Sequence, residues 1–265
     1  MTQAITFADR YQAVLVPVIF EPWARELVRR ADPQADDNIL DLACGTGAVT
    51  RELAKRLPGS GNIAAADHSG EMLSVARSLA KEAGIDVEWV EADAAVLPFA
   101  DNRFNLAFCQ QALQFFPNKL GALRELRRVL KPGGRAVFCV QRELDVNPML
   151  KAQAATLETY VGAEAAAAVE AICSLPDSTE IQMLFETAGF RDIEVTSVSL
   201  DLQHPDAAVF AAGAMGGMHT GDKLSGLADG DIDRAVEAFL DGLGDCLDGR
   251  SLRFPHVSNV IVATA

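Results

Sequence analysis

The sequence lacks the features that would point to a membrane or secreted protein. No stretch comes near the roughly eighteen uninterrupted apolar residues that a membrane span needs. The N-terminal residues 1–6 carry no basic region, and Pro17 interrupts the apolar run from Ala13 to Phe20, so no signal peptide is indicated. The sequence therefore predicts a cytoplasmic protein.

A disulfide framework and a metal-binding spacing are also missing. The five cysteines are scattered and contain no C-x-x-C pair, and the four histidines have no metal-ligand spacing. We therefore expect reduced cysteines that pack as small core residues, and no metal site. The cysteines are Cys44, Cys109, Cys139, Cys173 and Cys246.

Positive charge is scarce. The 265 residues include 23 Lys and Arg against 37 Asp and Glu, a net charge of −14 that repels a polyanion. No Asp/Asn-Pro-Pro-aromatic motif follows the fourth expected strand, and no Pro-Cys pair is present, which argues against methylation of DNA bases. We expect a small-molecule partner and no nucleic acid. The oligomeric state is left open, and a homodimer is one arrangement the sequence allows.

The first half of the chain alternates short apolar runs with amphipathic stretches, a pattern typical of a parallel α/β sheet. Between the strands, apolar residues recur three or four positions apart, which predicts helices. The sequence Lys-Pro-Gly-Gly is expected to end the last of these helices before the next strand. The expected strands are 38–43, 62–67, 87–93, 104–109 and 134–140, and the expected helices are 49–57, 69–83 and 120–130.

After Val140 the pattern changes. Residues 149–175 are Ala-rich and predict a helical stretch, 179–188 predict a further helix, and 191–202 alternate as a strand. A second helical insert over about 204–247 precedes a closing strand over 252–264. We interpret the whole chain, 1–265, as one domain.

The strongest motif is the run from Ile39 to Gly47, a buried strand that enters a glycine pair and then a helix. Glycines suit a turn with positive φ and a close approach of a ligand to the backbone. Thr50 occupies the place of the third glycine in a dinucleotide fingerprint, and Asp41 before the loop is unsuited to a pyrophosphate. A carboxylate there favours a cationic or amino-bearing ligand.

Two further acids end the next two expected strands. Asp67 lies twenty residues after Gly47, where doubly wound folds place an acid that binds ribose hydroxyls. Asp93 ends the third strand, where it can accept a hydrogen bond from an exocyclic amine such as that of adenine. This set predicts a ligand that is nucleoside-like, lacks phosphate and has a positive end. S-adenosylmethionine fits this description.

On these residues the chain resembles the class I S-adenosylmethionine-dependent methyltransferases, in the branch of ubiquinone, menaquinone and small-molecule secondary-metabolism enzymes. The resemblance covers about residues 37–141 and rests on the motifs at 40–47, 67–73, 91–93, 97–99, 110–116 and 128–135. It implies a doubly wound, Rossmann-like sheet of seven strands, mostly parallel with an antiparallel last strand. It also implies an N-terminal helical lid (1–30), a cofactor-binding core (37–141), and helical inserts with closing strands (142–265).

The resemblance also implies roles for single residues. The loop from Ala43 to Gly47 would hold the methionine moiety, Asp67 the ribose, and Met72 would pack on adenine. The full cofactor-binding set is Asp41, Ala43, Cys44, Gly45, Gly47, Asp67, His68, Met72, Asp93, Ala94 and Gln110.

Apolar and aromatic residues outside the core predict a small apolar or aromatic methyl acceptor, methylated on oxygen, carbon or nitrogen. The expected substrate pocket contains Tyr11, Trp23, Gln111 and Phe115, and His219 is the one candidate for a general base. Two alternatives stay open at this point. One is an S-adenosylmethionine-binding enzyme of this fold with a non-methylating reaction, such as a cyclisation in a secondary-metabolite pathway. The other is a non-catalytic binding protein.

Overall fold

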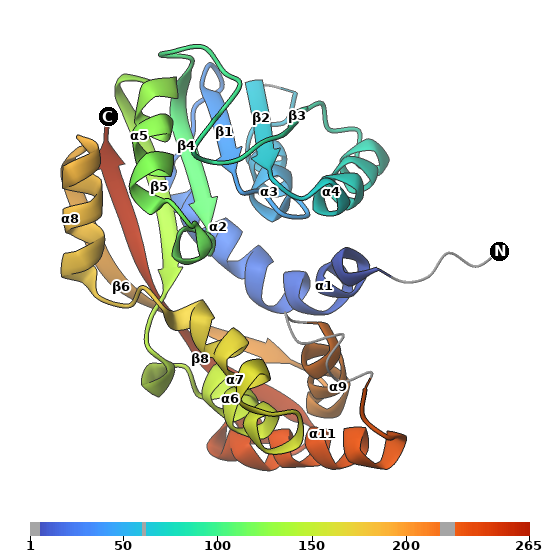
Figure 1. Ribbon diagram of the computed structural model, residues 1–265. Helices are drawn as coiled ribbons and strands as arrows, with labels where there is room; N and C mark the ends of the chain where they lie inside the picture. The colour runs from blue at the N-terminus through green and yellow to red at the C-terminus, as the bar shows by residue number, and fades with distance from the viewer. Residues whose placement is uncertain (1–5, 60–61, 218–225) are drawn as a thin grey trace. The chain divides into compact units, whose positions relative to one another are not determined.

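The computed structural model describes residues 6–59, 62–217 and 226–265 (Figure 1). The chain divides into two compact units, each built from three segments. The sheet unit contains Phe20–Val140, Leu175–Val198 and Ser258–Ala265, and the helical unit contains Met1–Ile19, Gln141–Ser174 and Ser199–Val257. The organisation as a single domain stays a prediction.

Five parallel strands form the centre of the sheet unit. β1 (Asn38–Leu42) lies between β2 (Asn62–Asp67) and β4 (Phe104–Gln110), while β3 (Glu88–Glu91) flanks β2 and β5 (Leu130–Gln141) flanks β4. All four of these pairings are parallel. The predicted parallel α/β sheet is confirmed, and its strand order places the carboxyl ends of β1, β2, β3 and β4 at one edge.

The sheet continues from β5 through β8 (Ser251–Thr264) to β6 (Arg191–His204). β8 runs antiparallel to β5. Gly133 and Gly134 near the start of β5 bond the backbone of Ala265, whereas Arg142, just past its end, bonds Val257. The predicted antiparallel last strand is therefore confirmed.

The predicted count of seven strands is wrong, because the sheet has eight strands in the described part of the chain. The additional strand, β7 (Leu247–Asp248), has two residues and pairs antiparallel with β8. So short a strand leaves no apolar alternation in the sequence from which it could be predicted.

Among the described residues of this unit there are five α-helices, and capping side chains explain where three of them begin. Side chains of Ser69, Asn118 and Asp177 accept backbone N–H groups at the first turns of α4 (Gly70–Glu82), α5 (Lys119–Val129) and α8 (Ser178–Ala188). The other two are α2 (Glu21–Ala31) and α3 (Ala48–Arg56). The expected Lys-Pro-Gly-Gly stop before a strand is corrected: β5 begins at Leu130, so these four residues lie inside it.

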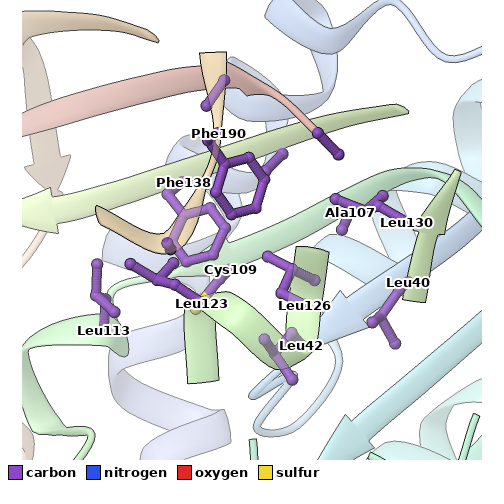
Figure 2. Close-up of a cluster of buried hydrophobic side chains, with 14 of the residues drawn as sticks. Leu40, Leu42, Ala107, Cys109, Leu113, Leu123, Leu126, Leu130, Phe138 and Phe190 are labelled. Carbon is purple, nitrogen blue, oxygen red and sulfur yellow. The ribbon is translucent and has the colours of Figure 1, made fainter. Parts of the chain in front are cut away.

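The main core of the sheet unit lies under α5 and α8 (Figure 2). Leu40 and Leu42 of β1, Cys109 of β4 and Phe138 of β5 share one face of the sheet, and each is at most 2% exposed. Phe138 packs edge-on against Phe185 of α8 at 5.2 Å. Since alternate strand residues point to opposite faces, the residues between these positions belong to the other face, where α2 contacts β4 and α4 contacts β2.

The helical unit contains α1 (Phe7–Leu15), α6 (Pro148–Tyr160), α7 (Ala163–Glu170), α9 (Ala207–Gly217) and α11 (Asp229–Leu243). α1 packs on α9 so closely that a Cβ on Gly213 would lie 2.7 Å from Val14. α6 packs against α7 and α11. The single helical stretch expected over 149–175 is corrected to two helices separated at Val161 and Gly162, followed by a 3-10 turn at Ala171–Cys173.

The N-terminal segment stays helical where Pro17 was expected to break it. Residues Val16–Phe20 form a π-helical turn between α1 and α2. Proline removes one backbone donor, and a wider turn accommodates that loss without ending the helix. Further 3-10 turns lie at Leu113–Phe115, Leu144–Val146 and Gly244–Cys246.

Candidate functional site

The strand register gathers three predicted site residues on one face of the sheet. Asp41 of β1 is level with Ala65 of β2 and Phe108 of β4. Asp67 and Gln110 lie two residues further along those neighbouring strands, so their side chains point to the same face as Asp41. The carboxyl ends of β1, β2 and β4 therefore present two carboxyl groups and one amide side by side.

The loop that leaves β1 turns sharply directly after Leu42. Ala43, Gly45 and Gly47 have φ of 54°, 55° and 81°, values in the left-handed region. The Cys44 N–H donates to Ala66 O at 3.1 Å, and the Gly47 N–H donates to Cys44 O at 2.8 Å. The loop is thus tied to β2 and to itself.

The two glycines of this loop face different surroundings. A Cβ on Gly47 would approach the ring of Trp89 to 3.3 Å, so this glycine permits close packing inside the protein. A Cβ on Gly45 would meet nothing within 4 Å. The space in front of Gly45 is open to a ligand that approaches the backbone.

Asp67 is held by backbone groups on both sides. It is 6% exposed; its Oδ2 accepts the Gly45 N–H at 2.8 Å and its Oδ1 accepts the Ser69 N–H at 2.9 Å. His68 lies beside it, with Nδ1 3.4 Å from Asp67 Oδ1 and a side chain that is 85% exposed. The Asp67 carboxylate therefore fixes the glycine loop and keeps lone pairs for a further donor.

Asp41 is the most deeply buried acid of the site. Its Oδ2 accepts the backbone N–H of Thr50 at 3.0 Å and the Thr50 hydroxyl at 2.6 Å. Burial raises the pKa of Asp41 to about 7, the Thr50 hydrogen bonds oppose that rise, and the negative charge of Asp67 adds to it. Asp41 thus links β1 to the first turn of α3.

The third strand end is built differently. Asp93 is exposed, and its Oδ1 accepts the Ala95 N–H at 2.8 Å, which closes a tight turn after β3. Ala94 is half-buried. Met72 is also half-buried and lies in the first turn of α4, where its N–H donates to the Ser69 hydroxyl at 3.3 Å.

Two glutamines follow the fourth strand with their amide groups anchored. Gln110 Nε2 donates to Phe20 O at 2.9 Å, and Gln111 Nε2 donates to Ser258 Oγ at 2.7 Å. Because Phe20 O can only accept, the orientation of the Gln110 amide is fixed. The Oε1 atoms of both glutamines are buried and have no hydrogen-bond partner among the described residues. A buried acceptor without a partner is unusual, because most buried polar atoms are hydrogen-bonded.

The residues predicted for the substrate pocket are distributed over both units. Tyr11 belongs to the helical unit, where its ring lies 6.1 Å from that of Phe7. In the sheet unit Trp23 is fully buried and Phe115 is 40% exposed. His219 lies outside the described residues. Their grouping into one pocket stays a prediction.

Comparison with known proteins agrees with this arrangement. Residues 39–134 match the methyltransferase domain family. The demethylmenaquinone methyltransferase of Staphylococcus carnosus is 30% identical over 225 residues, which cover 79% of this chain and 85% of that protein. The ubiquinone/menaquinone biosynthesis C-methyltransferase UbiE of Klebsiella pneumoniae (strain ATCC 700721 / MGH 78578) is 30% identical over 184 residues, covering 65% and 73%.

The chain belongs to the class I S-adenosylmethionine-dependent methyltransferases. Within this family it falls in the branch of the ubiquinone and menaquinone methyltransferases, as its motifs predicted. The methyltransferase is an enzyme that uses S-adenosylmethionine as its methyl donor. The non-methylating alternative is not favoured by these relatives.

A solved structure supports the fold of this methyltransferase. Phosphoethanolamine N-methyltransferase 2 of Haemonchus contortus, in complex with S-adenosyl-L-methionine, superimposes with a TM-score of 0.57 at 20% identity over 92% of this chain and 52% of that one. In the described part of the methyltransferase, no helix has the length and apolar character to cross a membrane.

Sequence reasoning missed the contacts that hold the site residues in place. Thr50 was noted only as the missing third glycine, yet it is the partner of Asp41. A buried hydroxyl on the first turn of a helix needs an acceptor, and the acid on the preceding strand supplies it. The partners Phe20 and Ser258 lie 90 and 147 residues from their glutamines, and nothing in the sequence predicts them.

Proposed function

We propose that S-adenosylmethionine binds at the carboxyl ends of β1 to β4. The observation that carries this proposal is the open space at Gly45, whose N–H donates to the Asp67 carboxylate. Gln110 at the end of β4 adds a buried Oε1 that has no hydrogen-bond partner among the described residues. The Asp67 carboxylate and the Gln110 amide oxygen are both acceptors, so they suit a ligand that brings hydroxyl groups and positive charge. The ribose diol, the ammonium group and the sulfonium of this cofactor supply them.

In this proposal each residue keeps the role that the resemblance implies. The Ala43–Gly47 loop holds the methionine moiety, Asp67 the ribose hydroxyls, and Gln110 lies below the methyl group. Asp93 and Ala94 meet the adenine edge, with Met72 against the ring. Asp41 acts beneath the loop, because its hydrogen bonds go to Thr50. The remaining residues of the proposed set are Cys44, Gly47 and His68.

For the acceptor, we propose a ring carbon of a small apolar aromatic compound of the demethylmenaquinone type. The support is the activity of the relatives, a demethylmenaquinone methyltransferase and a ubiquinone/menaquinone biosynthesis C-methyltransferase. The net charge of −14 also favours a small uncharged acceptor over nucleic acid. Tyr11, Trp23, Gln111 and Phe115 are the proposed pocket residues, and His219 the proposed base.

The chemistry divides between cofactor and protein. The bound cofactor supplies an electrophilic methyl group. The protein binds and orients both reactants and excludes water from them, which is the main requirement for an in-line displacement. Each of these methylations releases one proton, but an electron-rich ring carbon loses it only after the new carbon–carbon bond has formed, so carbon methylation makes the smallest demand on a general base.

The acceptor is tested with methyl-deuterated S-adenosylmethionine and a panel of candidates. The purified protein is incubated with short-chain demethylmenaquinone in its oxidised and reduced forms, and with matched phenols and amines. We expect a labelled methyl group on a ring carbon of the demethylmenaquinone, located by mass spectrometry and NMR. Label on oxygen or nitrogen, or turnover of the other compounds only, would contradict the proposed acceptor while leaving methyl transfer intact.

We propose in addition that the N-terminal segment, 1–30, acts as a lid. The support is that α1 precedes the first core strand and carries its own capping box at Thr6 and Asp9. Hydrogen exchange should show weak protection of α1 without ligands and stronger protection with S-adenosylhomocysteine and acceptor, while α2, which contains the fully buried Trp23, stays protected in both states. Equal protection of α1 in both states would contradict the lid.

A further inference from the structure

The segment between β3 and β4 carries the two residues proposed for the adenine edge. Asp93 and Ala94 open a tight turn in which the Val96 N–H donates to Asp93 O at 2.9 Å. The turn leads directly into Leu97, which is 4% exposed. Asp93 itself is exposed, so the position of its carboxylate depends on how the residues after it are held.

Two side chains of α5 hold that segment by its backbone. Glu125 Oε1 accepts the Leu97 N–H at 2.8 Å, and Arg128 Nη2 donates to Leu97 O at 3.0 Å. Arg128 Nη1 donates to Phe99 O at 2.8 Å and to Asp101 Oδ1 at 2.6 Å. Both backbone polar groups of Leu97 are therefore fixed from one helix.

Glu125 and Arg128 also fix each other. Arg128 Nε donates to Glu125 Oε2 at 2.9 Å and Nη2 donates to Oε1 at 2.7 Å, a bidentate pair one helical turn apart. Their side chains are 18% and 33% exposed. A planar guanidinium can serve the carboxylate and the carbonyl oxygens at once, whereas the single ammonium of a lysine lacks that geometry.

We propose that Glu125 and Arg128 are positioning residues for the adenine end of the cofactor, acting through the backbone of Leu97 to Asp101 on Asp93 and Ala94. This inference rests on the proposed function, because it takes the adenine edge to lie at Asp93 and Ala94. It adds two residues that touch neither cofactor nor acceptor. The two residues should affect how strongly the protein prefers adenine over another nucleobase. A pair with a purely structural role would not change that preference.

The test compares two ligands that differ at the base. S-adenosylhomocysteine carries the exocyclic amine that Asp93 is proposed to accept, and S-inosylhomocysteine carries a carbonyl there. Dissociation constants are measured by calorimetry for the wild type, Arg128→Lys and Glu125→Gln. Arg127→Gln is the matched control, since Arg127 lies on the same helix but donates to Gly189 O at 2.8 Å.

We expect the wild type to prefer the adenosine ligand. Arg128→Lys should weaken its binding about tenfold, the size of one lost charge-assisted contact, with a much smaller effect on the inosine ligand. Discrimination should thus fall in Arg128→Lys and, to a lesser degree, in Glu125→Gln, but not in Arg127→Gln. Glu125→Gln keeps an acceptor for the Leu97 N–H. If Arg128→Lys does not fold, the ratio of the two dissociation constants in Glu125→Gln tests the proposal.

Different outcomes would contradict the positioning role and the proposed cofactor binding. Unchanged discrimination in both α5 variants, or an equal loss for the two ligands, would overturn the positioning role and leave cofactor binding intact. A wild type that binds both ligands equally would overturn the assignment of the adenine edge, and the inference with it. A wild type that binds neither would overturn the proposed cofactor site.

Discussion

The loops after β1 and after β3 both carry acids of the proposed cofactor site, but they are stabilised in opposite ways. The loop after β1 is stabilised by buried carboxylates. Asp67 accepts a hydrogen bond from the Gly45 N–H, and Asp41 accepts hydrogen bonds from the N–H and the hydroxyl of Thr50, just after the loop. In the loop after β3, Asp93 is exposed, and the anchors come from Glu125 and Arg128 on α5.

This difference distinguishes residues that contribute to both stability and cofactor binding from residues that contribute to cofactor binding alone. A buried carboxylate must keep its hydrogen-bond partners, because leaving a donor or acceptor unpaired in the interior costs free energy. An exposed carboxylate carries no such constraint. Substitutions at Asp67 and Asp41 should therefore change stability, whereas one at Asp93 should change affinity only.

Removal of Asp67 should have the largest effect. Asp67→Ala leaves the N–H groups of Gly45 and Ser69 without their acceptor and removes the proposed contacts to two ribose hydroxyls. Each charge-assisted contact contributes about 1.5–3 kcal/mol, so cofactor affinity should fall at least about tenfold, and stability should fall as well. Calorimetric titration and denaturant unfolding measure the two losses. Unchanged affinity would contradict the ribose assignment.

Asp41 should make stability depend on pH. Its pKa is raised from 3.8 to about 7 in the folded protein, so between these values the folded state binds a proton that the unfolded state does not. The free energy of unfolding should therefore fall as pH rises from about 4 to about 7, by up to roughly 4 kcal/mol, and stay level above that range.

Asp41→Asn removes this titration and should flatten the pH profile, so its stability relative to the wild type should be greater at pH 8 than at pH 5. Thr50→Val is the matched variant. The Thr50 hydrogen bonds lower the pKa of Asp41, so losing the hydroxyl should raise that pKa and extend the decline in stability to higher pH. Denaturant unfolding across the pH range measures both. Parallel profiles for wild type and Asp41→Asn would contradict the burial of a titrating acid here.

The two glycines of the loop sharpen the comparison within one turn. Both have positive φ, which costs a residue with a Cβ about 1–2 kcal/mol. Gly47→Ala adds a contact with Trp89 at 3.3 Å, so it should be the less stable variant. Gly45→Ala places its methyl group in open space and should lose cofactor affinity instead. Thermal unfolding and calorimetry together distinguish them; a reversed order of stability would count against this assignment.

Asp93→Asn should have the smallest effect. The side chain is exposed and an asparagine oxygen can still accept the Ala95 N–H, so stability should stay within about 0.5 kcal/mol of the wild type. The loss of negative charge toward the exocyclic amine should weaken cofactor binding by a factor of about three to ten. A large drop in thermal stability with unchanged binding would show that the loop after β3 depends on this acid as the loop after β1 depends on Asp67.

Much of the sheet unit was predictable because its periodic patterns are local. The apolar runs that became β1, β2 and β4 and the three-and-four spacing of α3, α4 and α5 lie within a residue or two of their expected bounds. The acids at the strand ends were found because a parallel sheet places successive carboxyl ends at one edge. The predictions failed where the signal was short, as at the two-residue β7, or nearly uniform, as across the Ala-rich stretch that forms α6 and α7.

The sequence by itself determined the order of strands and helices, the glycine loop, the family and the methyl donor, since each depends on residues close together in the chain. Only the tertiary structure decided which acid is buried and which is exposed. Three hydrogen bonds of the site also join residues far apart in sequence: Gln110 to Phe20, Gln111 to Ser258, and Arg128 to Leu97. Such contacts follow from how helices pack on the sheet, and packing brings distant residues together without leaving a periodic trace in the sequence.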